Sequence, residues 1–200
     1  MKRIFIPLAI LTATPVFAQT AAPASSPGLG GPVVPGICLI SREAIYANAA
    51  VAKAAAARLK QLSDAAEAEI AADRKPIDAE IETFRAGAAK LTPEQRSARD
   101  QAFVARLQPI QAKAQLRARE IEATRVKAMQ RIADMTQPII AGIYAQRKCG
   151  LLVDRNSVLG GNLANDLTAD VVRGLDAKVT TISFDRESLP AAPTQRNGGS

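Results

Sequence analysis

The stretch of residues 42–148 constrains the fold more than any other part of the sequence. It contains only two glycines and consists largely of Ala, Glu, Gln, Lys and Arg, which is the composition of long helices. Apolar residues recur along it at spacings of three, four or seven, so they share one face of a helix. The first such series is Leu59, Leu62, Ala66, Ile70, Ile77, Ile81, Phe84, Ala88 and Leu91. This pattern predicts long helices that pack through a coiled-coil-like seam.

The seam is interrupted near residues 91–93, where the sequence predicts the start of a second helix. Thr92 is suited to be its N-cap, Pro93 fits the first helical position, and Gln95 can complete a capping box. A chain that restarts a helix here must either kink sharply or turn back. Turning back lets the two seams bury each other, so we expect an antiparallel helical hairpin with its turn at this point.

In an antiparallel hairpin, the numbers of facing residues add to a near constant. This rule pairs Phe84 with Phe103, and we expect both rings to lie in the seam rather than on an exposed binding surface. The same rule places Pro76 beside Pro109. An interior proline removes a helical hydrogen bond, so these two residues are hinge candidates; the alternative is two independently tolerated kinks in an exposed rod.

The two arms of the predicted hairpin differ in charge. Residues 42–91 are neutral, whereas residues 94–148 carry 11 basic and 5 acidic side chains. The basic arm either is an ordinary solvated helix face or attracts an acidic or anionic partner. The basic residues that we assign to this surface are Arg96, Arg99, Arg106, Lys113, Arg117, Arg119, Arg125, Lys127 and Arg131.

The residue types present argue against an enzyme. The chain has no His and two Cys, which excludes His-dependent triads and cysteine-cluster zinc sites. The carboxylates of the helical stretch alternate with Lys and Arg, as surface charge does, and form no paired-carboxylate pattern. We therefore expect no catalytic residues, no metal site and no cofactor.

Both ends of the chain are predicted to lie outside the fold. Residues 1–18 have the basic start, apolar stretch and small-residue cleavage pattern of a signal peptide. The alternative, a retained membrane anchor, is disfavoured because the apolar run is shorter than the about 20 residues that a spanning helix needs. Residues 19–36 and 185–200 are rich in Pro, Gly, Ser and Ala, and we expect a disordered leader and a disordered tail.

Residues 37–41 and 149–184 are predicted to form a small base from which the hairpin grows. Short apolar runs at residues 37–40 and 151–153 have strand length, and the hairpin returns them to the same place. Thr168 is suited to cap a short helix, and residues 179–184 alternate like a last strand. The base has little apolar surface of its own, so we expect several copies to pool their cores.

Cys38 and Cys149 stand at the two ends of the predicted hairpin and obey its register. Since the signal peptide directs the chain to an oxidising compartment, we expect a disulfide between them. Two buried thiols, or bridges between subunits, are the alternatives. A redox-catalytic pair is disfavoured because the chain has no C-x-x-C motif.

The order of strand, long helical hairpin, strand, turn and short helix resembles the OmpH/Skp family of periplasmic chaperones over residues 37 to about 176. The most specific part is the run LLVDRNSV at 151–158, followed by DLTADVV at 166–172. The resemblance implies an α+β, mainly α fold: a small β-rich trimerisation body with long helical tentacles that enclose a cavity. It also implies a homotrimeric, ATP-independent periplasmic holdase whose partners are unfolded outer-membrane proteins. A lipopolysaccharide site is described for the family, so anionic lipid or lipopolysaccharide is a further partner, to which no motif here assigns residues.

Two other classes of protein compete with this interpretation. Structural or adaptor proteins of the cell envelope also carry helical hairpins on small β bases, but they normally have a membrane anchor and further β domains. A basic coiled coil that binds nucleic acid conflicts with the export signal and with the lack of stacking aromatics in the basic arm.

Overall fold

The computed structural model describes residues 30–190. The predicted signal peptide, most of the predicted leader and residues 191–200 lie outside this range. The described elements are β1 (Ile37–Ile40), α1 (Arg42–Asn48), α2 (Ala50–Gly87), the 3-10 turn η1 (Ala88–Lys90), α3 (Pro93–Gln146), β2 (Leu151–Asp154), η2 (Arg155–Ser157) and α4 (Thr168–Asp176).

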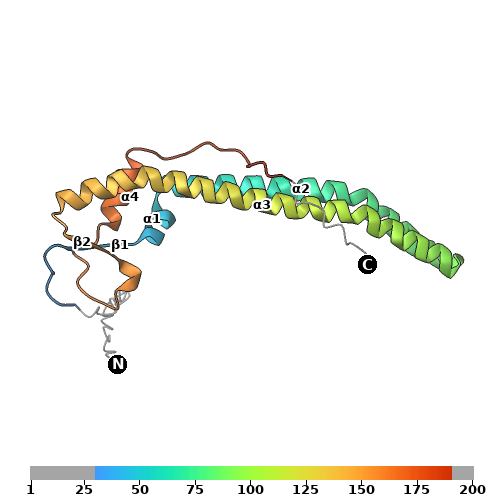
Figure 1. Ribbon diagram of the computed structural model, residues 1–200, viewed down its shortest axis with the longest axis horizontal. Coiled ribbons are helices and arrows are strands. Elements are labelled where there is room, and N and C mark those ends of the chain that lie inside the picture. Colours follow the sequence, from blue (N-terminus) through green and yellow to red (C-terminus); the bar gives the residue numbers. More distant parts are fainter. Residues whose placement is uncertain (1–29, 191–200) are drawn as a thin grey trace, which may run out of the picture.

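Helices α2 and α3 form a long antiparallel hairpin that projects from a small base (Figure 1). The 54 residues of α3 alone span about 81 Å at 1.5 Å per residue. The predicted capping box is present at the turn: Thr92 accepts a hydrogen bond from the Gln95 amide, and the Gln95 side chain accepts one from the Thr92 amide. Pro93 occupies the first turn of α3. The predicted turn and its chemistry are therefore confirmed.

The predicted register of the hairpin is also confirmed. The rings of Phe84 and Phe103 pack edge to face with centroids 5.5 Å apart. Phe103 is buried, as expected for a seam residue, and Ile77 is buried further along the same seam. Phe84 is half-buried, so one side of its ring remains open to solvent.

The start of the hairpin differs from the prediction of one helix beginning at residue 42. The chain breaks at Ala49, whose backbone is extended (φ −62°, ψ 136°), so α1 and α2 are separate helices. Ser41 caps α1 through the Ala44 amide. The Ala50 amide at the start of α2 donates to Asp176 Oδ1 at 2.7 Å, so a distant carboxylate takes the place of a local cap. No local sequence signal marks this break because the capping group comes from α4.

Helices α2 and α3 continue without interruption through Pro76 and Pro109. Each proline lacks an amide hydrogen, so one carbonyl in each helix is without its usual helical partner. A third interior proline, Pro138, lies in α3 near the base and was not among the hinge candidates. Flexibility at Pro76 and Pro109 remains a prediction.

The base holds a two-stranded parallel sheet, in which Ile37 pairs with Leu151 and Ile40 with Asp154. This confirms that the runs before and after the hairpin are neighbours. The strand predicted at Val179–Phe184 is wrong: this segment is extended but pairs with no strand in the described part of the chain. Its apolar alternation is real, yet the surface that buries it is the helical hairpin.

The core lies where the base meets the hairpin. Helix α4 packs on α1, α2 and α3 there, and Val171 and Leu175 are fully buried together with Ile132 of α3. At Gly174, a Cβ atom would lie 2.8 Å from Cγ2 of Ile139, so the glycine permits close approach of α4 to α3. The base thus draws much of its core from the hairpin of its own chain.

The predicted disulfide is confirmed. Cys38 in β1 and Cys149 after α3 are bonded; their Cα atoms are 5.8 Å apart, and the sequence separation is 111. Neither thiol is free in the structure, so the predicted pairing is the one observed. The bond joins the two ends of the hairpin beside the sheet.

Candidate functional site

The basic arm on α3 faces a row of carboxylates on α2, which sequence reasoning did not single out. Arg106 forms two hydrogen bonds with Glu80, one of them 2.8 Å long between Nη2 and Oε1. The Nζ atom of Lys113 lies 2.7 Å from carboxylate oxygens of both Asp73 and Glu69. The hairpin register could have predicted the pairs Glu80–Arg106 and Asp73–Lys113, because their residue numbers have almost the same sum as those of the two phenylalanines.

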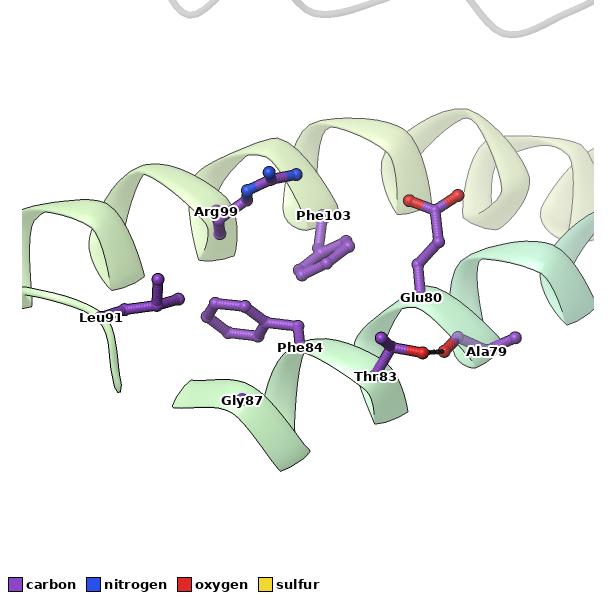
Figure 2. Close-up of a pocket in the computed structure, with 8 residues that line it drawn as sticks. All are labelled: Ala79, Glu80, Thr83, Phe84, Gly87, Leu91, Arg99 and Phe103. Atoms are coloured by element: carbon purple, nitrogen blue, oxygen red, sulfur yellow. Dashed lines mark hydrogen bonds between the residues drawn. The ribbon is translucent and has the colours of Figure 1, made fainter. Parts of the chain in front are cut away.

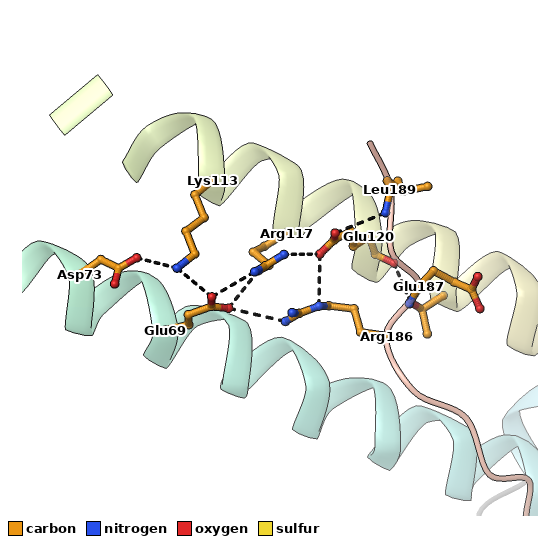
Figure 3. A network of polar contacts seen from close by, with 9 residues as sticks. Glu69, Asp73, Lys113, Arg117, Glu120, Arg186, Glu187 and Leu189 are labelled. Carbon is orange, nitrogen blue, oxygen red and sulfur yellow. Dashed lines mark hydrogen bonds and ion pairs between the residues drawn. The ribbon is translucent and has the colours of Figure 1, made fainter. Parts of the chain in front are cut away.

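A denser polar network lies at the middle of the hairpin (Figure 3). Arg117 bonds with Glu69 at 2.9 Å and with Glu120 at 2.8 Å. Hydrogen bonds from Arg117 and from Lys113 hold the pKa of Glu69 at about 2. Glu120 is only 3% exposed, so its charge depends on the cations around it.

Three further members of the basic arm also have partners. Arg125 bonds with Glu122 one turn away, and Lys127 lies 2.9 Å from a carboxylate oxygen of Glu187. Arg131 donates a hydrogen bond to the Ser183 carbonyl. The last two contacts are to the extended segment after α4.

The remaining members of the arm, Arg96, Arg99 and Arg119, form no ion pair with any described residue. Arg99 and Arg119 are exposed, and Arg96 is half-buried. The positive charge available to a partner is therefore concentrated on fewer residues than the sequence predicts. The other members of the arm already neutralise carboxylates or bind backbone within the chain.

An apolar pocket of about 480 Å³ opens near the tip of the hairpin (Figure 2). Phe84, Phe103 and Leu91 form its apolar lining, and Arg99 and Glu80 stand at its edge. The pocket combines an exposed apolar surface with a cation that has no ion-pair partner in the described chain. This combination suits weak contacts with varied apolar or acidic groups rather than recognition of one small molecule.

The described residues show neither a metal cluster nor a membrane span. Among residues 30–190, no group of three or more Cys, Asp or Glu side chains is placed to hold a metal ion. No helix in that range has both the length and the apolar character to cross a bilayer.

Comparison with known proteins identifies the architecture. The OmpH family, described as outer membrane protein (OmpH-like), matches residues 36–175. The chain belongs to the OmpH-like family. The family match covers the base and the hairpin but ends at the last residues of α4. It confirms the family to which the sequence was compared and the mainly helical fold.

A solved structure shares the OmpH-like fold. It is the crystal structure of an OmpH-like candidate outer membrane chaperone from Caulobacter crescentus CB15, with 34% sequence identity and a TM-score of 0.70. The alignment covers 81% of this chain and 96% of that one. No curated protein sequence matches the chain.

Proposed function

We propose that this OmpH-like protein is an ATP-independent holdase chaperone that binds unfolded outer-membrane proteins, its clients, in the periplasm and prevents their aggregation. The observation that carries this proposal is the family match over the base and the hairpin, together with the OmpH-like structure from Caulobacter crescentus. The hairpin supports it physically, because a rod about 80 Å long can contact a client of protein size. The proposed holding of clients needs no enzymatic reaction.

We propose that three copies assemble through their bases, with the hairpins surrounding a shared cavity. Several large apolar side chains are exposed on the base of a single chain, and contact between copies would remove them from water. They are Val33, Val34, Ile37, Leu151, Leu159 and Leu163. Strand β2 pairs only with β1 among the described residues, so its outer edge is open to a strand of another copy.

The surface of the hairpin supports loose and general binding. Arg96, Arg99 and Arg119 would attract acidic segments of a client, and the same groups would attract anionic lipid or lipopolysaccharide. Phe84 and Leu91 offer apolar contacts near the tip. Attraction between exposed charges weakens with salt, so we expect client capture to slow as ionic strength rises.

Two features support action outside the cytoplasm. Residues 1–18 have the pattern of a cleaved signal peptide, although they lie outside the described range. The disulfide between Cys38 and Cys149 is of the kind that persists in oxidising compartments such as the periplasm.

Turbidity measures the proposed activity directly. A urea-denatured outer-membrane β-barrel protein is diluted into buffer with or without the purified chaperone and without ATP. We expect the chaperone to suppress aggregation at about one trimer for each client. An adaptor or structural protein of the same shape would leave the turbidity unchanged, and that result would refute the proposal.

A further inference from the structure

The segment after α4 follows the hairpin as an extended ribbon, visible in Figure 1 as the red segment along α3. We call residues 182–189 the C-terminal strap. Ile182, Phe184 and Arg186 are half-buried, and the residues between them are exposed. Successive side chains of an extended chain point to opposite sides, so one face of the strap lies on the hairpin. Residues 185–190, predicted as the start of a disordered tail, instead continue this ordered ribbon.

Side chains of both hairpin helices bind carbonyl groups of the strap. Nε of Arg58, in α2, donates to the Phe184 carbonyl at 3.2 Å. Nη1 of Arg131, in α3, donates to the Ser183 carbonyl at 3.2 Å. Two consecutive carbonyls are thus bound by guanidinium groups from opposite helices.

Side chains of α3 also bind amide groups of the strap. The Glu187 amide donates to Thr124 Oγ1 at 2.9 Å, and the Leu189 amide donates to Glu120 Oε1 at 3.4 Å. Hydrogen bonds to backbone groups do not depend on the bound sequence. Arg58, Glu120, Thr124 and Arg131 therefore bind the main chain of an extended polypeptide. Together with Glu69, which contacts a strap side chain, we call these hairpin side chains the strap seat.

Three strap side chains add ion pairs: Asp185 with Arg58 and Glu187 with Lys127, each at 2.9 Å, and Arg186 with the polar network of the hairpin (Figure 3). Arg186 places Nε 3.2 Å from a carboxylate oxygen of Glu120 and Nη1 3.8 Å from one of Glu69. Glu120 is buried, so a basic residue at this position of the ribbon compensates a charge that water reaches poorly. Ile182 and Phe184, on the same face of the ribbon, pack against the hydrophobic core.

We propose that the strap seat is a binding site for an extended segment of an unfolded client, and that the C-terminal strap is its intramolecular occupant. The preferred client segment has two apolar residues at alternate positions, as Ile182 and Phe184 are in the strap. A basic residue follows two positions after the second, as Arg186 does. Strands of outer-membrane barrels have such alternation, with apolar side chains on one face and polar ones on the other. That the partner is an unfolded client rests on the proposed chaperone function. That the seat can exchange its strap for another peptide does not depend on that function.

The strap follows the part of the chain that the family model matches, which ends at residue 175. Being tethered, it has an effective concentration of the order of millimolar, against which a client segment must compete. A client that covers several seats of an assembly gains from multivalency and can win this competition.

A labelled peptide of residues 181–190, TISFDRESLP, tests the exchange. In the full chain, the variant Arg186→Glu places a third carboxylate beside Glu69 and Glu120. Repulsion among the three should release the strap of the variant from the seat. We expect this variant to bind the wild-type peptide at least about tenfold more tightly than the wild-type chain does, the effect of one charge-assisted hydrogen bond. The matched control is Ser188→Glu, which introduces the same glutamate side chain at an exposed position and should leave peptide binding at the wild-type level.

Fluorescence anisotropy gives the affinities, and circular dichroism checks that each variant is folded. Equal peptide binding by the wild-type chain and Arg186→Glu, or none by either, would overturn the proposal. If Arg186→Glu does not fold, hydrogen exchange of the wild-type chain decides instead. Unfolded client should then accelerate exchange of the Glu187 and Leu189 amides, and unchanged protection in a client complex would contradict displacement. Since the peptide assay contains no client, its outcome is independent of the turbidity assay of the chaperone function.

Discussion

The disulfide between Cys38 and Cys149 should contribute more to stability than any other single contact of the chain. It joins positions 111 residues apart, across the whole hairpin. In the chain-entropy description, cross-linking a loop of this length removes enough freedom from the unfolded chain to stabilise the fold by about 4.8 kcal/mol at 25 °C. This value is an upper figure, because residual helix in the unfolded chain already restricts it.

The test compares the oxidised chain with the variant Cys38→Ala plus Cys149→Ala. Alanine keeps both positions small and apolar, which matters because Cys38 is buried. Urea unfolding followed by circular dichroism, at one fixed chain concentration, should show a loss of about 2 to 5 kcal/mol in the free energy of unfolding. The wild-type chain in reductant should match the variant. A loss below about 1 kcal/mol would refute the argument from loop length.

Three more predictions follow from contacts in the hairpin and base. Gly174→Ala should lower the unfolding midpoint, because its new methyl group meets a buried isoleucine and overpacking costs about 1 to 3 kcal/mol, only partly offset by helix propensity; an unchanged midpoint would show that α4 can move away from α3. The pKa of Glu69 is held at about 2 by its cationic partners, below its ordinary value, so its contribution is present above about pH 4.5 and lost as the pH falls toward 2; Glu69→Gln should therefore flatten the pH dependence of the unfolding midpoint over that range. Replacing Pro76 and Pro109 with Ala should narrow the distribution of spin-label distances between tip and base, whereas an unchanged distribution would rule out a hinge at this level.

The hairpin could be predicted from sequence because its signals are local or repeat regularly. The capping box around Thr92 locates the turn, and the turn then fixes which residues face each other. That register correctly pairs Phe84 with Phe103 and brings Cys38 to Cys149. Applied to charged residues, it would also have found the pairing of Glu80 with Arg106.

The parts that could not be predicted depend on partners remote in sequence. Ala49 breaks the first helix because Asp176, far along the chain, caps the next one. The alternation of residues 179–184 correctly indicates an extended segment with one buried face. Periodicity does not specify what buries that face, and here the surface is a pair of helices rather than a strand.

The basic arm shows the same limit. Composition gives the net charge of α3, but the charge available to a partner depends on which side chains are already paired. Arg106, Lys113 and Arg117 are bound to carboxylates of α2, and Arg131 is bound to the strap. Within the basic arm, we therefore expect Arg96, Arg99 and Arg119 to contribute most to the proposed attraction of acidic clients.

Native mass spectrometry of the protein with a denatured outer-membrane β-barrel protein tests the central claim most directly. The account predicts a complex of three chains with one client, formed without ATP and weakened by salt during assembly. Persistent monomers, or a trimer that holds no client under conditions where the client alone aggregates, would contradict it.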